Sequence, residues 1–274
     1  MNIAIQGQAG SFHDKARVKL FTHSEPLVCE TFSDVFNAVI TAQAEYGIVA
    51  IENSLYGSIN EVYSLLLDKK LWISGEVYLR VSFALIGQKE STLEQITEVH
   101  SHPIAIAECS KFLDSYLPNA ELINTSDTAK SVQMLTESGL VNQAAIAHAD
   151  LAQKHDLQVL KDHIENDAKN YTRFIIIQRD KQQPANANKT SVILRLPERP
   201  GTLHEALGFF AERNINLTKL ESHPVPGEVW EYIFYVDFEA PLSQAKDVIE
   251  KLKANGSEVT VLGSYTKANP LGED

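Results

Sequence analysis

The 274-residue sequence predicts an α/β protein with two lobes, followed by a smaller module of element order βαββαβ. Three observations support this prediction. Short apolar runs alternate with segments of helical spacing over residues 1–180. A polar tract, DKQQPANANKT, then lacks any periodicity at 180–190. Beyond it, the apolar residues alternate as they do in half-buried strands. We therefore expect domains at 1–180 and 190–274, joined by a linker.

The first region contains near-continuous apolar runs of strand length, which favour parallel sheets covered by helices on both faces. The segment at 71–87 is expected to cross from one lobe to the other, and the run at 173–177 to return. The predicted lobes are approximately 1–75 with 168–180, and 76–167. The runs are IAI (3–5), YGIVAI (46–51), VSFALIG (81–87), AAIA (144–147) and RFIII (173–177).

The C-terminal module is expected to contain a helix that RPGTL (199–203) opens and that runs through Leu203, Leu207 and Phe210, and a second helix at 243–253. Its strands are predicted at 191–196, 214–222, 230–238 and 257–265. Within 230–238, strict alternation assigns side chains to two faces. Ile233 and Tyr235 belong to one face, and the other face holds Trp230, Tyr232, Phe234, Val236 and Phe238.

Charge and composition exclude several classes of partner. The net charge of -12 argues against nucleic acid, because duplex binding requires a basic surface. The apolar runs are too short to span a membrane, and the N-terminus has no leader-like segment. Only two cysteines occur, Cys29 and Cys109, without a CxxC spacing. These features predict a cytosolic protein without disulfides.

Several strand-to-helix junctions carry helix-capping residues. Ser11 with Asp14 and Ser58 with Glu61 have capping-box spacing. Pro103 suits a first helical position after an extended His102, and Thr125, Ser126 and Asp127 suit the start of another helix. In an open α/β sheet, such junctions surround a ligand crevice and offer backbone N–H groups to anions. Each is also explained by capping alone, so together they permit an anion-binding cleft without requiring one.

Motifs for cofactors and metals are missing. GQAG (7–10) lacks the third glycine of a dinucleotide loop, and no P-loop, HExxH or GxSxG occurs. We expect neither a cofactor nor a metal.

The run Asn170-Tyr171-Thr172-Arg173-Phe174 places Thr172 and Arg173 at the start of an apolar strand. Arg173 has two open interpretations, bidentate binding of a carboxylate or a surface ion pair.

Segments in the right order over essentially the whole chain resemble the motifs of prephenate dehydratases. These are GQAGSFHD (7–14), IENSLYGSI (51–59), SHPIAIAEC (101–109), AAIAHADLA (144–152) and NYTRF (170–174). RPGTLHEAL (199–207) and NINLTKLESHP (214–224) resemble the ACT regulatory domain that follows in that family.

The resemblance implies a dehydratase domain like a type II periplasmic binding protein, with the active site between its lobes. It implies conversion of prephenate to phenylpyruvate in L-phenylalanine biosynthesis, without cofactor, in a homodimer or homotetramer. It also implies feedback inhibition by phenylalanine at the ACT domain.

Matching positions imply that Thr172 is catalytic, with Glu52 or Glu108 expected to relay a proton. Substrate-binding positions are Arg173, Asn53, Ser54, Ser101, Glu108 and Ser11. Effector-binding positions are Gly201, Thr202, Leu203, Asn216, Leu217, Glu221 and Ser222.

The chain departs from the family pattern at several positions. Ile104 and Glu108 stand where glutamines are usual, His13 replaces a serine, and His223 replaces the arginine of the ESRP motif. Glu108 adds a carboxylate near an anionic substrate, and His223 predicts pH-dependent sensing. Arogenate as the substrate, prephenate decarboxylation, and a non-catalytic amino-acid-sensing binding protein remain alternatives.

Overall fold

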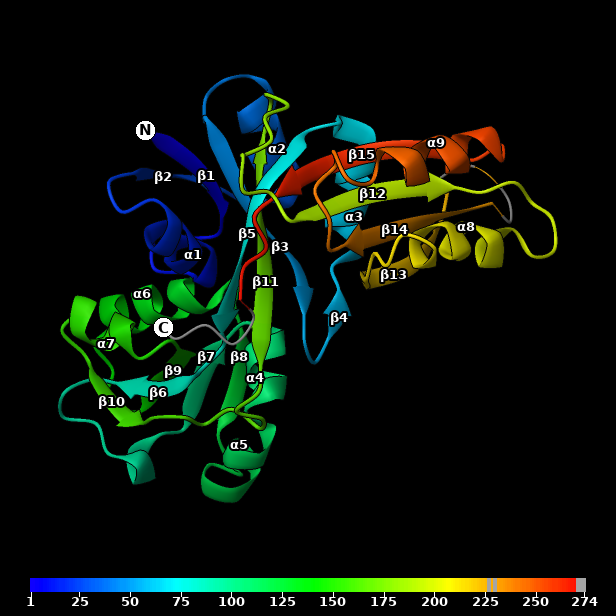
Figure 1. Ribbon diagram of the computed structural model, residues 1–274. Coiled ribbons are helices and arrows are strands. Elements are labelled where there is room, and N and C mark those ends of the chain that lie inside the picture. Colours follow the sequence, from blue (N-terminus) through cyan, green and yellow to red (C-terminus); the bar gives the residue numbers. More distant parts are fainter. Residues whose placement is uncertain (226–227, 229–230, 270–274) are drawn as a thin grey trace.

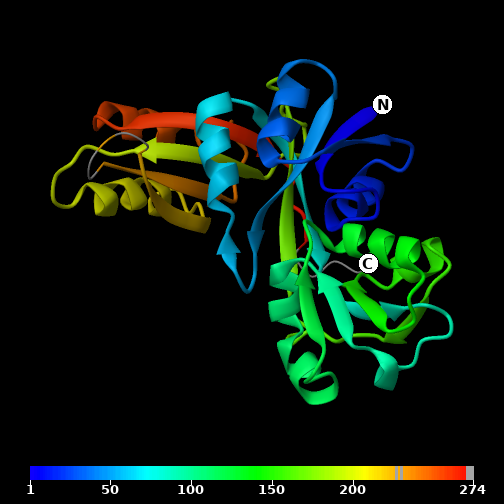
Figure 2. The same cartoon turned by 180° about the vertical axis from the view of Figure 1, so that it is seen from behind.

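The computed structural model describes residues 1–225, 228 and 231–269, and it contains three sheets (Figure 1). Two of them form the lobes of the N-terminal region, and the third belongs to the C-terminal module. Two long strands, β5 (Trp72–Arg80) and β11 (Tyr171–Gln178), run from the first lobe toward the second, as the view from behind also shows (Figure 2). The chain thus passes from the first sheet to the second after β5 and returns along β11.

The first lobe contains a six-stranded sheet of order β2-β1-β3-β11-β5, with β4 paired to β3. Its remaining elements are β1 (Asn2–Gln6), α1 (Phe12–Leu20), β2 (Glu25–Cys29), α2 (Phe32–Ile40), β3 (Tyr46–Asn53), β4 (Gly57–Ser58) and α3 (Asn60–Lys69). The expectation of a parallel sheet is only partly correct. β1 is parallel to β2 and β3, whereas β11 is antiparallel to both β3 and β5. The antiparallel part arises because β11 returns from the second lobe.

The second lobe has a five-stranded sheet of order β10-β6-β9-β7-β8, which is also mixed. β7 is parallel to β8 and β9, and β6 is antiparallel to its neighbours. Its elements are β6 (Ala84–Gly87), η1 (Leu93–Gln95), β7 (Glu98–Ser101), α4 (Pro103–Glu108), α5 (Ser110–Tyr116), β8 (Glu121–Asn124), α6 (Thr128–Ser138), β9 (Gln143–Ala147), α7 (Asp150–Lys154) and β10 (Gln158–Lys161).

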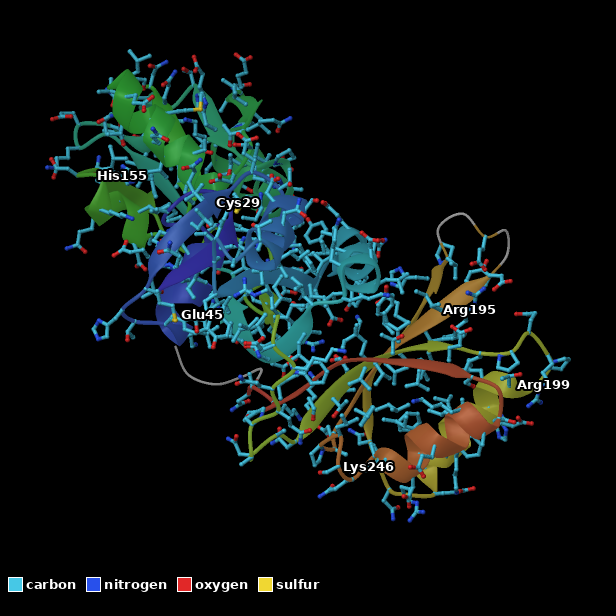
Figure 3. All side chains as sticks on the ribbon, turned by 90° about the horizontal axis from the view of Figure 1, so that it is seen from above. Cys29, Glu45, His155, Arg195, Arg199 and Lys246 are labelled. Carbon is cyan, nitrogen blue, oxygen red and sulfur yellow. The ribbon has the colours of Figure 1, made fainter. Side chains whose placement is uncertain are left out.

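The C-terminal module has the predicted βαββαβ order, in an antiparallel sheet arranged β13-β14-β12-β15. Its elements are β12 (Lys189–Arg195), α8 (Thr202–Ala211), β13 (Leu217–Pro224), β14 (Tyr232–Phe238), α9 (Lys246–Ala254) and β15 (Glu258–Tyr265). Trp230 of the predicted 230–238 strand lies outside the described residues, as do residues 270–274. Arg195 and Arg199 mark the end of the module that lies far from the lobes (Figure 3).

The two faces of β14 pack against different partners, as its alternation predicted. Val236 and Phe238 join the core beneath α8 and α9. Ile233 and Tyr235 join the core of the first lobe, which also includes Ile73. The module is thus docked on the first lobe through a continuous hydrophobic core.

Most of the predicted helix starts are present. Ser11 accepts a hydrogen bond from the Asp14 N–H at 3.3 Å, and Asp127 caps α6 by accepting from the Lys130 N–H at 2.9 Å. Pro103 opens α4 after an extended His102. The prediction for Ser58 is wrong. Ser58 lies in β4, and α3 begins at Asn60 without a side-chain cap, because the Ser58 hydroxyl instead binds charged side chains of β13.

Both cysteine thiols are buried and free. Within the part of the chain that the structure describes, every helix is too short or too polar to cross a bilayer.

The docking of β15 on β5 requires a glycine, which gives a testable prediction. A Cβ on Gly263 would lie 2.1 Å from the Ile73 carbonyl oxygen, so Gly263→Ala forces the two strands apart. We expect the free energy of unfolding to fall by about 1–3 kcal/mol in a denaturant titration.

Gly208→Ala is the matched control, because Gly208 lies within α8 and a Cβ there meets nothing within 4 Å. Alanine at a helix interior should raise stability by about 0.5–1 kcal/mol. Equal stability of Gly263→Ala and the wild type would show that the strands separate without cost.

Candidate active site

A cavity of about 570 Å³ opens between the two lobes. Much of its wall is aromatic or aliphatic, including Phe12, Phe32, Val81, Phe83 and Phe174. Polar groups come from both lobes: Asn53 ends β3, Thr172 lies on β11, and Glu108 ends α4. The cavity therefore combines an apolar pocket with a few convergent polar groups, as ligand sites usually do.

Thr172 and Asn53 form a hydrogen-bonded pair in this wall. They lie opposite each other in the β3–β11 ladder, and Asn53 Nδ2 donates to Thr172 Oγ1 at 3.1 Å. The Asn53 amide has a fixed orientation, because its Oδ1 accepts from the N–H groups of Leu55 and Tyr56 at 2.8 and 3.0 Å. An amide nitrogen can only donate, so the Thr172 hydroxyl proton is free to point at a ligand.

Asn170 extends this pair toward the second lobe. Its Oδ1 accepts from Asn53 Nδ2 at 2.7 Å, and its side chain is fully buried. The residue was part of the NYTRF motif but was not assigned a role. The signal in the sequence that could have identified Asn170 is its position two residues before Thr172, because side chains at this spacing share one face of a strand.

Glu108 is the carboxyl group of the wall that is nearest to these amides. It is only 5% exposed. Burial raises the pKa of Glu108; the Asn170 amide opposes this shift, and the Glu165 carboxylate adds to it. The net shift is upward, so the protonated carboxyl persists to higher pH than in water.

His13 is a wall residue that the sequence marked only as a departure from the family. Its Nε2 accepts a hydrogen bond from the Ala50 N–H at 3.2 Å, and its ring meets Phe174 edge-on at 5.0 Å. Burial lowers the pKa of His13 to about 3. The ring is therefore neutral at physiological pH and gives the cavity no positive charge.

The described wall of the cavity contains helix starts and no cationic lysine or arginine side chain. The first turns of α1 and α6 both reach the wall, through Ser11 and Thr128. The positive dipole ends of these helices favour an anion, and at α6 the Asp127 carboxylate already occupies part of the helix start.

Arg173 and Glu52, two of the predicted site residues, do not line the cavity. They follow Thr172 and precede Asn53 on their strands, so their side chains emerge on the opposite face of the sheet. Arg173 is 4% exposed and is bound by Glu76 at 2.8 Å and Asp237 at 2.6 Å. Arg173 therefore neither faces the cavity to bind a substrate carboxylate nor forms a surface ion pair. It forms a buried ion pair between the two domains.

Ser54 and Ser101 also have structural contacts instead of facing the cavity. Ser54 Oγ accepts from the Tyr171 N–H at 2.9 Å and donates to the Lys169 carbonyl, which ties β3 to the start of β11. Ser101 is fully buried and donates to the Ile146 carbonyl at 2.7 Å. Of the eight predicted active-site residues, the structure brings Thr172, Asn53, Glu108 and Ser11 together in the cavity wall.

The seven predicted effector residues lie around α8 and β13. Gly201 has φ +87° at the start of α8, with open space where a Cβ would be, and Thr202 is buried beside it. On β13, Glu221 faces the first lobe and Ser222 is exposed on the opposite face. Leu203 follows in α8, Leu217 begins β13, and Asn216 donates to Glu239 at 2.9 Å.

A second cavity, of about 730 Å³, lies against α1 and contains none of the predicted active-site residues. Among the described residues, histidine, cysteine and carboxylate side chains form no group of three suited to a metal ion.

Comparison with known proteins identifies the family. The prephenate dehydratase family model matches residues 3–182, and the ACT domain model matches residues 190–256. The chain belongs to the prephenate dehydratase family. A bifunctional chorismate mutase/prephenate dehydratase of Aquifex aeolicus is 32% identical, over 98% of this chain and 74% of that protein. The arogenate dehydratase/prephenate dehydratase 1 of Arabidopsis thaliana is 35% identical, over 97% of this chain and 71% of its own length.

Two solved structures agree with the fold of this family member. Prephenate dehydratase from Arthrobacter aurescens, in complex with L-Phe, has a TM-score of 0.89 at 28% identity, covering 100% of this chain and 92% of that one. A protein described as GqqA, a novel type of quorum quenching acylase, has a TM-score of 0.85 at 31% identity, covering 98% of both chains. Different activities are thus described on one fold, so the chemistry of this dehydratase family member must be argued from its cavity.

Proposed function

We propose that this protein dehydrates and decarboxylates prephenate to phenylpyruvate, for L-phenylalanine biosynthesis, in the cavity between the lobes. The observation that carries the proposal is the Thr172–Asn53 pair, in which a hydroxyl proton is held free beside an apolar pocket. The family match over both domains supports the same substrate.

The reaction requires little bond-making chemistry from the protein. Prephenate is a dianion that takes up one proton and loses water and carbon dioxide as its ring becomes aromatic. An enzyme accelerates this reaction by holding the substrate in position, by protonating the leaving hydroxyl, and by surrounding the departing carboxylate with a poorly solvating wall. Phe32, Phe83 and Phe174 supply an apolar wall for the ring and for the carboxylate that leaves.

Thr172 is the group that hydrogen-bonds the leaving hydroxyl. Its oxygen accepts from Asn53, which directs its proton outward. A threonine hydroxyl is too weak an acid to donate its proton alone, so a second group must supply it. Glu108 supplies that proton, because its raised pKa keeps it protonated further toward neutrality. Glu52, the alternative donor, lies on the other face of the sheet.

The carboxylate that the product retains binds the N-terminal amides of α1 and α6, with Ser11 at the first of these helix starts. Arg173 has no direct role in this binding, since its guanidinium is occupied by Glu76 and Asp237.

Arogenate is the second candidate substrate. It carries an ammonium where prephenate has a keto group, and the cavity wall includes two carboxyl side chains, Glu108 and Asp127. An ammonium would pair with either of them. The similarity to a plant protein named for both activities supports testing both substrates.

The protein is proposed to work in the cytosol as a homodimer or homotetramer. Its two thiols are free, as expected in a reducing compartment. In the described part of the C-terminal sheet, β13 pairs only with β14, which leaves its outer edge available to a second copy.

Phenylalanine is proposed to inhibit by binding at the ACT domain between subunits. The site uses the open space at Gly201 with Thr202 and Leu203, and the β13 region from Asn216 to Ser222. The L-Phe complex of the Arthrobacter relative supports this effector.

Thr172 provides the direct test of the reaction. Prephenate and arogenate are assayed separately, and we expect the wild type to form phenylpyruvate from prephenate. Thr172→Ala should lower kcat for prephenate by about two to four orders of magnitude. KM should change less, because the hydrogen bond strengthens in the transition state. Thr172→Ser keeps the hydroxyl and should retain most of the activity. Wild-type turnover by Thr172→Ala would remove Thr172 from the mechanism, and turnover of arogenate alone would select the second substrate.

Glu108 should determine the alkaline side of the pH profile. A proton donor works only while protonated, so kcat should fall as pH rises through the raised pKa of Glu108. Glu108→Gln keeps the shape but has no proton to give. We expect its kcat to drop by about 100-fold and to lose this dependence. Unchanged kcat in Glu108→Gln across pH 5–9 would exclude Glu108 as the donor.

Gly201 tests the effector site. Gly201→Ala adds a methyl group in the proposed ligand space and strains a φ of +87°, so L-phenylalanine should bind about tenfold more weakly by calorimetry. Gly139→Ala is the matched control, since Gly139 also has positive φ and open surroundings but lies after α6 in the second lobe. Equal phenylalanine affinity in the two variants would place the effector elsewhere.

Point variants are preferred to deletion of the C-terminal module, because deletion would leave Arg173 and Glu76 without Asp237 and Lys189.

A further inference from the structure

Arg173 and Glu52 form a residue pair on the face of the sheet that points away from the cavity, directly beside the pair in the cavity wall. In the β3–β11 ladder, Thr172 is opposite Asn53, and Arg173 is opposite Glu52. Alternation sends the first pair into the cavity and the second pair toward the C-terminal module. Any shift of Glu52 along or across the sheet therefore moves Asn53, its neighbour in the chain.

Side chains of the C-terminal module contact both Arg173 and Glu52. Asp237 of β14 binds Arg173 at 2.6 Å, and Tyr265 of β15 accepts from Arg173 Nη2 at 3.0 Å. Lys219 of β13 lies 3.2 Å from Glu52 and is only 8% exposed. The cavity strands are thus held from behind by side chains of the other domain.

Lys219 has further contacts that reach the cavity wall. Its ammonium donates to Ser58 Oγ at 2.8 Å and pairs with Glu221 at 2.9 Å, and it lies 5.2 Å from the centre of the Tyr63 ring. Ser58 is opposite Glu52 in the β3–β4 hairpin, and Ser58 itself lines the cavity. One ammonium therefore bridges both strands of the hairpin that carries Asn53.

We propose that Lys219 is a positioning residue for the reaction: it fixes the β3–β4 hairpin from behind and thereby holds Asn53 and Thr172 in register. The proposal rests on the proposed function for its kinetic consequence, whereas its structural consequence stands alone. Lys219 is a better test position than Asp237. Loss of Asp237 would leave Arg173 and Lys189 in a buried site with one carboxylate, whereas Glu52 and Glu221 are about one-third exposed and stay hydrated.

The first experiment measures amide hydrogen exchange, which does not depend on any activity. In Lys219→Met the N–H groups of Leu55 and Tyr56, which bind Asn53 Oδ1, should exchange about fivefold faster than in the wild type. Methionine keeps the apolar stem over Tyr63. Lys251→Met is the control, because Lys251 also pairs with a glutamate and lies 5.7 Å from the centre of an aromatic ring, but only within the C-terminal module. Equal exchange in the two variants overturns the proposal.

The second experiment measures kinetics with prephenate. Lys219→Met should lower kcat about fivefold with little change in KM, and Lys251→Met should change neither. Glu52→Gln should produce a similar loss, and the losses of the two single variants should not add in the double variant, because both substitutions break the Lys219–Glu52 contact. Additive losses, or a loss in KM alone, overturn the positioning role. If the wild type leaves prephenate unchanged, the proposed function fails, and the exchange experiment still decides the role of Lys219.

If Lys219→Met fails to fold, Lys219→Arg and Glu52→Gln are measured in its place. Arginine keeps the charge and should show slower hairpin exchange than Glu52→Gln. The reverse order contradicts the proposal.

Discussion

A buried cluster of four charges at the junction of the two domains is the constraint on which the rest of the structure depends. Arg173, Glu76, Lys189 and Asp237 have side-chain exposures of 4%, 0%, 2% and 8%. Burial alone would raise the pKa of Asp237, but Arg173 and Lys189 reverse this and the net shift is downward. Each charge is tolerable only because the others are present. The cluster therefore favours one docking register of the C-terminal module, in which Gly263 lies against the Ile73 carbonyl oxygen.

The alternation of β11 explains why only Thr172, of the two adjacent residues predicted for the active site, lies in the cavity wall. Thr172 and Arg173 are adjacent, so a strand sends them to opposite faces. The resemblance assigned both to the active site, Thr172 as catalytic and Arg173 as substrate-binding, and composition gave no reason to separate them. Their separation became visible only with the C-terminal module, whose Asp237 lies 64 positions further along the chain than Arg173. Long-range charge pairing of this kind leaves no local pattern in a sequence.

Features set by short-range physics were predictable. Pro103 and Asp127 start helices because backbone geometry and capping act within one turn. The order of the elements in the C-terminal module also follows from local patterns. Ser58 shows the limit of such reasoning. Its spacing to Glu61 fits a capping box, yet its hydroxyl binds Lys219 and Glu221, which are distant in sequence. Likewise, the mixed direction of the sheets depends on where β11 returns, and apolar runs do not encode direction.

The placement of Arg173 also bears on how the cavity handles an anion. Two cations and two carboxylates make the buried cluster formally neutral, so it adds little field to attract a dianion into a protein of net charge -12. The described wall of the cavity has no lysine or arginine of its own. A guanidinium on the departing carboxylate would stabilise the substrate more than the transition state, in which that charge disperses into carbon dioxide, and so would slow its loss. Under the proposed function, the helix amides at α1 and α6 bind an anion more weakly than a guanidinium does, and they contact only the carboxylate that the product retains. Under the proposed function, this leaves the reacting carboxylate free to face Phe32 and Phe174, where poor solvation favours its departure.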